Sequence, residues 1–344
     1  MDEAIELVGV GNALVDVVAF SDEDVSEVLG LTPNKAIHVD SERFAELLVA
    51  LPNPSLSSGG GAANTVKIAS RLGIRSAFVG RLGSKSRGGP DRFADLFEKE
   101  MKEAGVETVL PRGDEPSGAC LTIRMNGGSF AVAACPSAAL GLEADDIPED
   151  LIRRAKILVL DGYLLGREKL VERTIGIAEH FGTAIALDVG SESLAAAFAP
   201  FIARLAASAS LILFMNEAET ISFSSTLRKT TDFDVNDVFD HLISMTQAGP
   251  FPIIVVKRGP LGALVFAGGS RFDAPARAVE PKDETGAGDT FAAGFLAAWI
   301  RDKPLAECAA LGNQVARETV SVPGTRIPPS MLRRLARPLS AKSK

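Results

Sequence analysis

A run of small and acidic residues near the C-terminal end of the sequence has the composition of an anion-binding helix start. It reads Asp283-Glu284-Thr285-Gly286-Ala287-Gly288-Asp289-Thr290-Phe291. Phe291, Phe295 and Trp299 then recur at intervals of four, which predicts a helix that begins at the glycines. The free N–H groups of a first helical turn favour a bound anion, and small residues let a phosphate approach the backbone closely.

Asp289 falls in or near the first turn of this expected helix. A carboxylate beside an anion site repels phosphate, so its presence there requires a chemical role. General base catalysis fits, because a carboxylate can take the proton of an acceptor hydroxyl as that oxygen attacks phosphorus. The structural alternative is an acidic residue that stabilises the helix dipole.

Five segments, taken together and in order, resemble the signatures of the ribokinase-like (PfkB) carbohydrate kinase family, and their pattern is most similar to its adenosine kinase branch. In chain order these are Gly11-Asn12 with Asp16, Gly59-Gly60-Gly61-Ala62-Ala63-Asn64 with Gly73 and Gly83, Asn216 with Glu219, Lys257-Arg258-Gly259-Pro260-Leu261-Gly262, and Asp283 to Asp289 as the DxTGAGD signature. Each segment alone would be weak support, whereas the ordered set is specific.

The resemblance implies an α/β fold, a ribokinase-like three-layer sandwich with a central mostly parallel sheet and a small β lid. It also implies transfer of the γ-phosphoryl group of ATP to a primary alcohol, a reaction that depends on positioning and charge stabilisation. Asp289 would be the general base, and the backbone of Gly286, Ala287 and Gly288 would form the anion hole. A lid that closes over the acceptor would exclude water and prevent ATP hydrolysis.

The same resemblance assigns residues to the nucleotide and its ions. The expected ATP contacts are Asn216, Lys257, Gly259, Gly262, Thr285 and Asn313. Asn216 and Glu219 would place Mg²⁺ mainly through water, which suits a cation that keeps its hydration shell. Their structural alternative is a helix cap and a solvated helix residue. Related kinases often bind a monovalent cation such as K⁺ near the anion hole, and Asp283 and Thr285 are the matching positions.

On the acceptor side, the resemblance points to Asp16 near the N-terminus. Its carboxylate would accept hydrogen bonds from two vicinal hydroxyls of a sugar, and Asn12 and Asn64 would add donors and acceptors. Gly59 and Gly60 would leave the wall open for close approach. The structural alternative for Asp16 is a turn residue that caps a strand end.

Three segments resemble the adenosine kinase branch more than the ribokinase branch: Gly11–Asp16, Leu29–Ile37 and Pro116–Cys120. A purine nucleoside is therefore the favoured acceptor, and a furanose or keto-sugar is the alternative. An adenine base would need an apolar slot. The candidate walls, each of which could instead be ordinary core, are Leu14, Ile37, Cys120, Phe130 and Tyr163.

The elements that must position these residues follow from the hydrophobic pattern. Short continuous apolar runs, mostly separated by helical stretches, are typical of strands buried on both faces of a parallel sheet. The clearest runs are Ile157–Leu160, Ala184–Leu187, Leu211–Phe214 and Ile253–Val256. The early strands and an Asn126-Gly127-Gly128 hairpin would form the lid. We therefore predict one kinase domain over residues 1–330, with a lid at about 14–40 and 115–135, and a C-terminal tail over 331–344.

Composition narrows the classes of function. The chain has 344 residues with 46% hydrophobic and 23% charged side chains, which rules out global disorder. A net charge of −8, one Trp and one Tyr argue against nucleic-acid binding. Three cysteines without CxxC spacing favour reduced thiols in the cytoplasm. No signal peptide or membrane span is visible, so we expect a cytoplasmic monomer or homodimer acting on a small molecule.

Two other classes compete with a kinase. A dinucleotide-dependent dehydrogenase would use the glycines at Gly9 to Asn12, but the fingerprint needs a third glycine at position 14, which is Leu14. A non-catalytic ligand-binding protein on the same fold would not need Asp289.

One departure from the family pattern is the basic loop 83–91, in which Lys85 and Arg87 could reach a phosphate on the acceptor or could simply be solvated.

Overall fold

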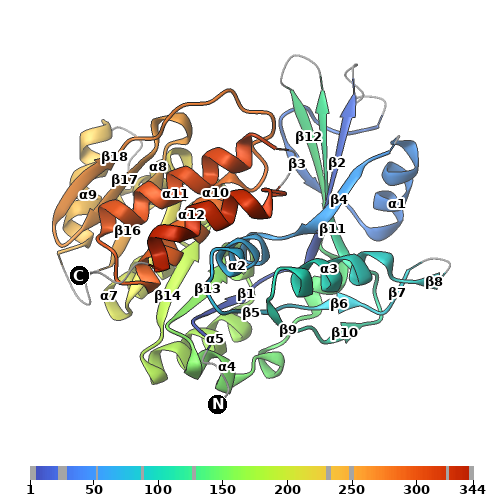
Figure 1. The fold of residues 1–344 in the computed structure, drawn as a ribbon, viewed down its shortest axis with the longest axis horizontal. Helices are drawn as coiled ribbons and strands as arrows, with labels where there is room; N and C mark the ends of the chain where they lie inside the picture. The colour runs from blue at the N-terminus through green and yellow to red at the C-terminus, as the bar shows by residue number, and fades with distance from the viewer. Residues whose placement is uncertain are drawn as a thin grey trace.

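The continuous apolar strands form one large sheet in the computed structural model, which describes residues 5–21, 29–51, 53–86, 89–125, 129–229, 234–247, 252–322 and 325–340 (Figure 1). Within those ranges the sheet has nine strands, in the order β18-β17-β16-β15-β14-β13-β1-β5-β9. Their bounds are β1 (Leu7–Val10), β5 (Ser76–Val79), β9 (Glu107–Val109), β13 (Ile157–Asp161), β14 (Ala184–Asp188), β15 (Leu211–Asn216), β16 (Ile253–Lys257), β17 (Ala263–Ala267) and β18 (Ser270–Ala274). Neighbours from β9 to β16 are parallel, and β17 and β18 are antiparallel.

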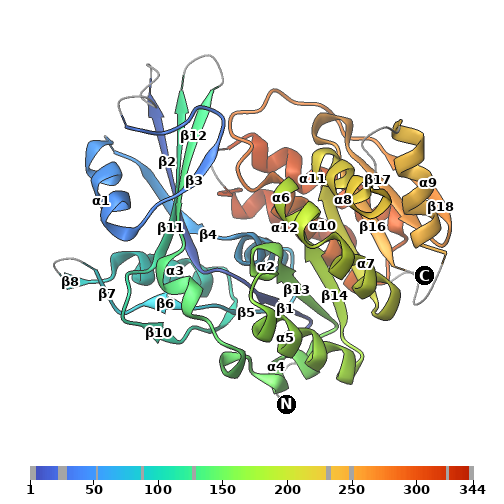
Figure 2. The same cartoon turned by 180° about the vertical axis from the view of Figure 1, so that it is seen from behind.

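Both faces of this sheet are buried, which explains the continuous apolar runs. Along β13, Ile157 and Val159 enter one hydrophobic core, whereas Leu158 and Leu160 enter the other. The first core is closed by α2 (Gly61–Arg71), α3 (Arg92–Glu103), α10 (Ala287–Ile300), α11 (Leu305–Val320) and α12 (Pro329–Ser340). The second is closed by α4 (Glu149–Arg154), α5 (Glu168–Phe181), α6 (Glu192–Ala197), α7 (Ala199–Ser208), α8 (Glu217–Arg228) and α9 (Val235–Met245), seen from behind in Figure 2. The predicted three-layer α/β sandwich is confirmed.

A smaller sheet stands beside the large one and carries the N-terminal strands (Figure 1). In the described residues it has five strands in the order β3 (Ala36–His38), β12 (Phe130–Cys135), β11 (Gly118–Met125), β2 (Leu14–Ser21) and β4 (Ser55–Gly59). Helix α1 (Ser41–Ala50) packs on one face of it, and Asp40 caps the helix by accepting a hydrogen bond from the Arg43 amide. The sequence pattern indicated β2, β3 and the β11–β12 hairpin, but it did not reveal β4, because serines and glycines fill that strand.

Several short elements complete the chain. Two-residue strands pair as β6 (Leu82–Gly83) with β10 (Arg112–Gly113), and as β7 (Lys85–Ser86) with β8 (Gly89–Pro90). Single 3₁₀ turns cover Ser137–Gly141, Ala144–Asp146, Gly162–Leu164 and Gly259–Leu261. The hairpin tip at 126–128 and Arg87 lie outside the described residues. Within the ranges given above, no helix is both long and apolar enough to span a membrane.

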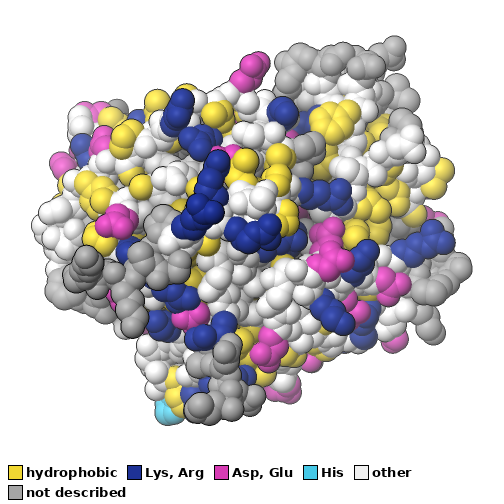
Figure 3. All heavy atoms as spheres, viewed as in Figure 1, with side chains coloured by type: hydrophobic (Ala, Val, Ile, Leu, Met, Phe, Trp, Pro, Cys, Tyr) yellow, Lys and Arg dark blue, Asp and Glu magenta, His cyan; other side chains and the backbone are white. Residues whose placement is uncertain are grey.

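The expected C-terminal tail over 331–344 is wrong for residues 331–340, which belong to helix α12. Leu332, Leu335 and Leu339 are buried in the same core as α2 and α10. Their spacing of three and four residues puts them on one helix face. Exposed arginines such as Arg333 lie on the solvent side of α12. Lys and Arg side chains also gather along the middle of the molecular face shown in Figure 3. The high content of basic residues suggested a solvated tail, although the leucine spacing is that of an amphipathic helix.

Candidate active site

Polar side chains lie where the parallel strands of the large sheet end. Asp161 is the last residue of β13, Asp188 of β14, Asn216 of β15 and Lys257 of β16. The strand register aligns Asp161 with Asp188 and Asn216 with Lys257. Ligands of open α/β sheets bind outside the carboxyl ends of the strands. This edge is therefore the natural place for a site in the fold.

The N-terminus of α10 faces this edge. Gly286 is the N-cap residue, with a φ of 71° that favours glycine, and it provides no side-chain cap. The amide of Ala287 donates to the carbonyl of Glu284 at 3.1 Å. The amides of Gly286 and Gly288 have no hydrogen-bond partner among the described residues. Of the three amides predicted to form an anion hole, the Ala287 amide is thus turned toward the preceding loop.

Asp289 lies in the first turn of α10 beside the glycine-rich segment. The Nδ2 of Asn64 donates to its Oδ2 at 3.1 Å, and a Cβ built on Gly61 would lie 3.6 Å from its Oδ1. Burial raises the pKa of Asp289 to about 8, and the nearby carboxylate of Asp188 adds to the rise. The Asn64 hydrogen bond and the Lys257 charge oppose it. A carboxyl with a pKa in this range is suited to accept a proton near neutral pH.

Asp16 projects from β2 against the glycines that precede α2. A Cβ on Gly59 would lie 2.2 to 2.4 Å from its carboxyl atoms, so only glycine fits there. Gly60 has a φ of 98°, and a Cβ on it would meet the Asn12 carbonyl at 2.2 Å. Burial raises the pKa of Asp16 to about 6, against the opposing charge of Lys67 and a hydrogen bond from Asn64. Asn64 therefore lowers the pKa of both Asp16 and Asp289 against the effect of burial.

Asn12 contributes an unsatisfied acceptor to this pocket. Its side chain is 7% exposed, and its Oδ1 has no hydrogen-bond partner among the described residues. A buried polar atom without a partner costs free energy unless a ligand or water satisfies it. The backbone of Asn12 lies next to the Asp161 carboxylate and Gly60, which places this residue beside the site.

Three of the five candidate wall residues, Leu14, Cys120 and Phe130, lie on the face of the small sheet that carries Asp16. Ile37 pairs with Ala133 and packs into the core on the opposite face, so it is not a wall on the Asp16 side. Cys120 is paired with Asp16 in the strand register, and Leu14 is two residues before Asp16, so all three point to the same side. Phe130 faces that side too, opposite Arg124 at the distal end. Tyr163 is 53% exposed, and its hydroxyl donates to the Gly190 carbonyl at 3.3 Å, so it lies at the rim.

A cavity of about 310 Å³ lies beside the N-terminal end of α10. Among its lining residues are Gly259, Gly262, Gly288 and Asn313, all predicted from the sequence. The Asn313 Nδ2, however, donates to the Ala274 carbonyl at 2.8 Å, which fastens α11 to β18. Its amide donor is thus engaged within the fold.

Lys257 lies next to the anion-binding turn, at the end of β16. Its Nζ donates to both carboxylate oxygens of Asp188, at 2.8 and 2.7 Å, and a Cβ on Gly288 would lie 3.1 Å from it. Burial lowers the pKa of Lys257, but the carboxylates of Asp188 and Glu219 outweigh that effect and raise it. A cation is therefore held beside the helix N-terminus.

Asn216 and Glu219 form a reciprocal cap at the start of α8. Asn216 Oδ1 accepts from the Glu219 amide at 2.8 Å, and Glu219 Oε2 accepts from the Asn216 amide at 2.9 Å. Glu219 is 4% exposed, so the part of the structural alternative that makes it a solvated helix residue does not hold, whereas the helix cap is present. Among the described residues no cluster of three or more His, Cys, Asp or Glu side chains could hold a metal directly.

Asp283 and Thr285 come together in the loop before α10, and an arginine of the small sheet contacts both. Arg124 Nη2 donates to Asp283 Oδ1 at 2.8 Å and to Thr285 Oγ1 at 3.3 Å. The Thr285 amide also donates to Asp283 Oδ1, at 2.9 Å. The two residues predicted to bind a monovalent cation thus bind a guanidinium in the structure.

Sequence analysis did not single out Arg124, Lys67, Asp161 or Asp188. Asp161 and Asp188 directly follow two of the predicted parallel strands, and that position is a usable signal, because carboxyl ends of such strands meet at one edge. Arg124 and Lys67 carry no such signal. The role of Arg124 or Lys67 can be recognised only from contacts with segments that are distant in the sequence.

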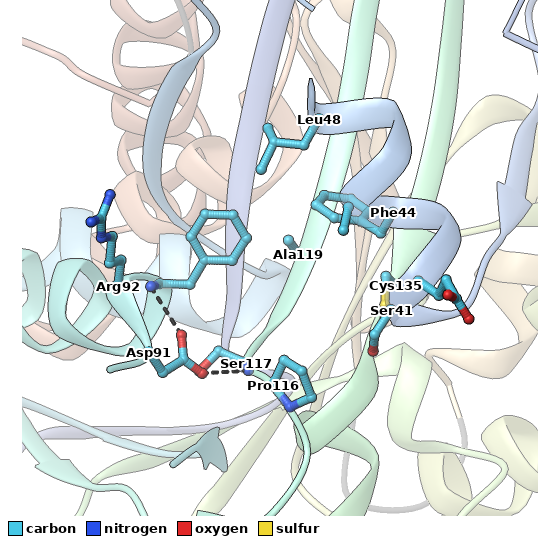
Figure 4. Close-up of a pocket in the computed structure, with 12 residues that line it drawn as sticks. Ser41, Phe44, Leu48, Asp91, Arg92, Pro116, Ser117, Ala119 and Cys135 are labelled. Carbon is cyan, nitrogen blue, oxygen red and sulfur yellow. Dashed lines mark hydrogen bonds between the residues drawn. The ribbon is translucent and has the colours of Figure 1, made fainter. Parts of the chain in front are cut away.

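A second cavity, of about 420 Å³, lies on the opposite face of the small sheet (Figure 4). It is lined by Phe44, Phe93, Ala119 and Cys135, among others, and by none of the predicted site residues. Ala119 precedes Cys120 in β11, so its side chain points away from Asp16. The Asp91 carboxylate at its wall accepts from the amides of Phe93, Ala94 and Ser117 and is an N-cap that ties α3 to β11.

A mostly parallel sheet flanked by helices, a small companion sheet and a glycine-rich helix start at the sheet edge are features of the class of ribokinase-like phosphotransferases. The chain belongs to the pfkB family of carbohydrate kinases, whose sequence pattern matches residues 24–331. It is therefore a kinase of the group that acts on sugars and nucleosides. Kinases of this family use ATP, generally with Mg²⁺.

Individual relatives fall into both acceptor groups. Fructokinase-1 of Zea mays is 27% identical over 71% of this chain and 74% of its own length. Adenosine kinase of Schizosaccharomyces pombe is 24% identical over 94% of this chain and 96% of its own. The crystal structure of adenosine kinase from Sinorhizobium meliloti superposes with a TM-score of 0.84 at 24% identity, covering 98% of this chain and 99% of that one. This last likeness shows a shared fold.

Proposed function

We propose that the chain transfers the γ-phosphoryl group of ATP to the primary hydroxyl of a purine nucleoside, with adenosine favoured. The observation that carries this proposal is the position of Asn64: it donates to Asp289 at 3.1 Å, and its side chain also opposes the rise in the pKa of Asp16. An acceptor whose vicinal hydroxyls bind Asp16 would therefore lie close to Asp289, the proposed general base, and to the phosphate-binding turn. Asp16 would hold the sugar, and Asp289 would take the proton.

The chemistry is an in-line phosphoryl transfer. The proton of the acceptor hydroxyl goes to Asp289, the oxygen forms a bond to the γ-phosphorus, and the bond to the bridging oxygen breaks to release ADP. The amides of Gly286 and Gly288 would stabilise the charge that develops on the transferred group, and Lys257 would add a positive charge beside them. The Ala287 amide would join only after leaving Glu284, to which it now donates.

The nucleotide and ion sites complete this proposal. Gly259, Gly262 and Asn313 would line the cavity that holds ATP, with Thr285 at its phosphate end. The side-chain oxygens of Asn216 and Glu219 lie at the sheet edge and already accept hydrogen bonds within the cap. Because these oxygens are engaged, we propose that they hold Mg²⁺ through its water ligands rather than directly. Mg²⁺ would neutralise phosphate charge when bound.

The acceptor preference is supported by the face of the small sheet around Asp16. Leu14, Cys120 and Phe130 give that face apolar side chains, which suit a purine ring better than an isolated sugar. The near full-length similarity to an adenosine kinase supports the same choice. A furanose or keto-sugar is the second candidate, and the similarity to fructokinase-1 favours it.

An acceptor screen tests the proposal. ADP release is measured with ATP, Mg²⁺ and one of adenosine, inosine, guanosine, cytidine, ribose, fructose or 2-keto-3-deoxygluconate. The proposal predicts the highest kcat/KM with adenosine or another purine nucleoside. Preference for fructose, ribose or the keto-sugar would select the second candidate. Ligand binding without ADP release from every acceptor would instead identify a non-catalytic ligand-binding protein.

The remaining expectations concern the cellular setting. We propose a cytoplasmic enzyme that acts as a monomer or homodimer on a small molecule. Support for a reducing compartment comes from Cys120, Cys135 and Cys308, which are free thiols. Size-exclusion chromatography with light scattering tests the oligomeric state.

A further inference from the structure

One ion pair connects the small sheet with the loop that leads into the anion-binding helix. It joins Arg124 of β11 to Asp283, 159 residues further along the chain, at 2.8 Å. The Asp283 side chain is fully buried, and that of Arg124 is 24% exposed. A buried carboxylate requires a counter-charge, and a guanidinium cannot lose its proton to escape the pair.

Asp283 is fixed to the large unit and shapes the phosphate-binding turn. Its amide and that of Lys282 donate to the Val320 carbonyl at the end of α11, at 3.3 and 2.7 Å. Its carboxylate accepts from the Thr285 amide at 2.9 Å, one residue before the N-cap Gly286. The charge on Asp283 therefore holds the path of the chain into α10.

Arg124 lies on the same face of the small sheet as Asp16. Strand register pairs Asp16 with Cys120 and places Arg124 four residues further along β11, between Phe20 and Phe130. At about 3.3 Å per residue, the two charged side chains arise about 13 Å apart on one face. An acceptor bound at Asp16 would therefore lie on the same face of the sheet as Arg124.

We propose that Arg124 is a positioning residue: its guanidinium is the permanent counter-ion of Asp283 and donates a hydrogen bond to Thr285, takes the place of a monovalent cation there, and ties the acceptor-binding face to the phosphate-binding turn. The inference rests on the proposed function for the identity of that face. It departs from the expectation that Asp283 and Thr285 bind K⁺, because the oxygens that such an ion would use accept the guanidinium hydrogen bonds.

Steady-state ADP release with and without K⁺ tests the proposal in the wild type, Arg124→Ala and Arg124→Lys. We expect the wild type to be insensitive to K⁺. We expect Arg124→Ala to lose kcat by about tenfold or more, the size of a typical coupling between sites. Guanidinium ion at a non-denaturing concentration should restore part of that loss, and K⁺ should stimulate this variant. Urea, which has a similar shape without charge, should not restore it.

The control variant is Arg153→Ala, which removes an exposed arginine that pairs with Asp150 on α4 and should leave every rate unchanged. Arg124→Lys should be intermediate, because an ammonium restores the charge without the planar fork. Strong K⁺ stimulation of the wild type would overturn the proposal. So would an Arg124→Ala variant with normal kcat, or one that guanidinium and K⁺ fail to improve.

A measurement without turnover separates this inference from the proposed function. If no acceptor yields ADP with the wild type, the proposed function fails. The ion pair is then tested by urea unfolding and by affinity for a fluorescent ADP analogue in Arg124→Ala, Asp283→Asn and the double variant. The proposal predicts that the loss in the double variant is smaller than the sum of the single losses. Additive losses in both measurements would contradict it.

Discussion

The side-chain amide of Asn64 donates a 3.1 Å hydrogen bond to the carboxylate of Asp289, although 225 residues separate them in the chain. Asn64 belongs to the first turn of α2, after the glycines that face Asp16, whereas Asp289 belongs to the first turn of α10. Two helix starts thus meet at the carboxyl edge of the sheet. This contact joins the part of the site that would hold the acceptor to the part that would hold phosphate.

Replacing Asn64 by Ala should shift the pH dependence of turnover. Burial raises the pKa of Asp289 to about 8, and the Asn64 hydrogen bond opposes that rise. Without this donor the ionised form is less stable, so the acid limb of kcat/KM against pH should move to higher pH. Loss of a hydrogen bond to a charged group predicts about tenfold lower kcat/KM at pH 7. Asn236→Ala on the exposed surface of α9 is the control, and an acid limb that stays in place would refute this explanation.

Gly59→Ala should impair acceptor binding selectively. The new methyl group would lie 2.2 to 2.4 Å from the Asp16 carboxyl atoms, so that side chain must move. Overpacking of this kind costs about 1–3 kcal/mol, and we expect the acceptor KM to rise while affinity for a nucleotide analogue is unchanged. Gly176→Ala in α5, where a Cβ would meet no atom within 4 Å, is the matched control and should keep the KM of the wild type. Equal effects of the two substitutions would contradict the prediction.

Lys257→Met should affect both stability and turnover. It leaves the mostly buried Asp188 carboxylate without its partner, because Lys257 donates to both of its oxygens. Breaking a buried pair in this way costs about 3 kcal/mol of unfolding free energy, measured by urea denaturation. Adding Asp188→Asn should recover much of the stability without restoring ADP release. Recovery of both in the double variant would show that Lys257 has no part in phosphoryl transfer.

Local sequence patterns predicted the large sheet and the start of helix α10 well. Apolar runs at Ile157–Leu160 and the three that follow define strands buried on both faces, and the glycines at 286 and 288 indicated a helix start with Asp289 in its first turn. Strand β4 was missed because Ser57, Ser58 and Gly59 have low strand propensity, and pairing with β2 overrides that preference. Helix α12 was missed because its arginines obscured the leucine spacing.

Contacts between distant segments could not be predicted from local patterns. Lys67 is an example: it is 3% exposed in the interior of α2, and its Nζ donates to the Ser58 carbonyl at 2.6 Å. A lysine on a helix is ordinarily exposed, so nothing in the sequence marks it as the charge that opposes the raised pKa of Asp16. The ion pair of Arg124 with Asp283 is hidden for the same reason.

The account depends most directly on Asp289 as the base that accepts the hydroxyl proton. The decisive measurement compares the wild type with Asp289→Asn in ADP release, with the best acceptor of the screen, and in binding of a fluorescent ATP analogue. The account predicts loss of at least about a hundredfold in kcat, the usual contribution of a general base, with nucleotide affinity retained. Turnover of Asp289→Asn within a few-fold of the wild type would contradict it.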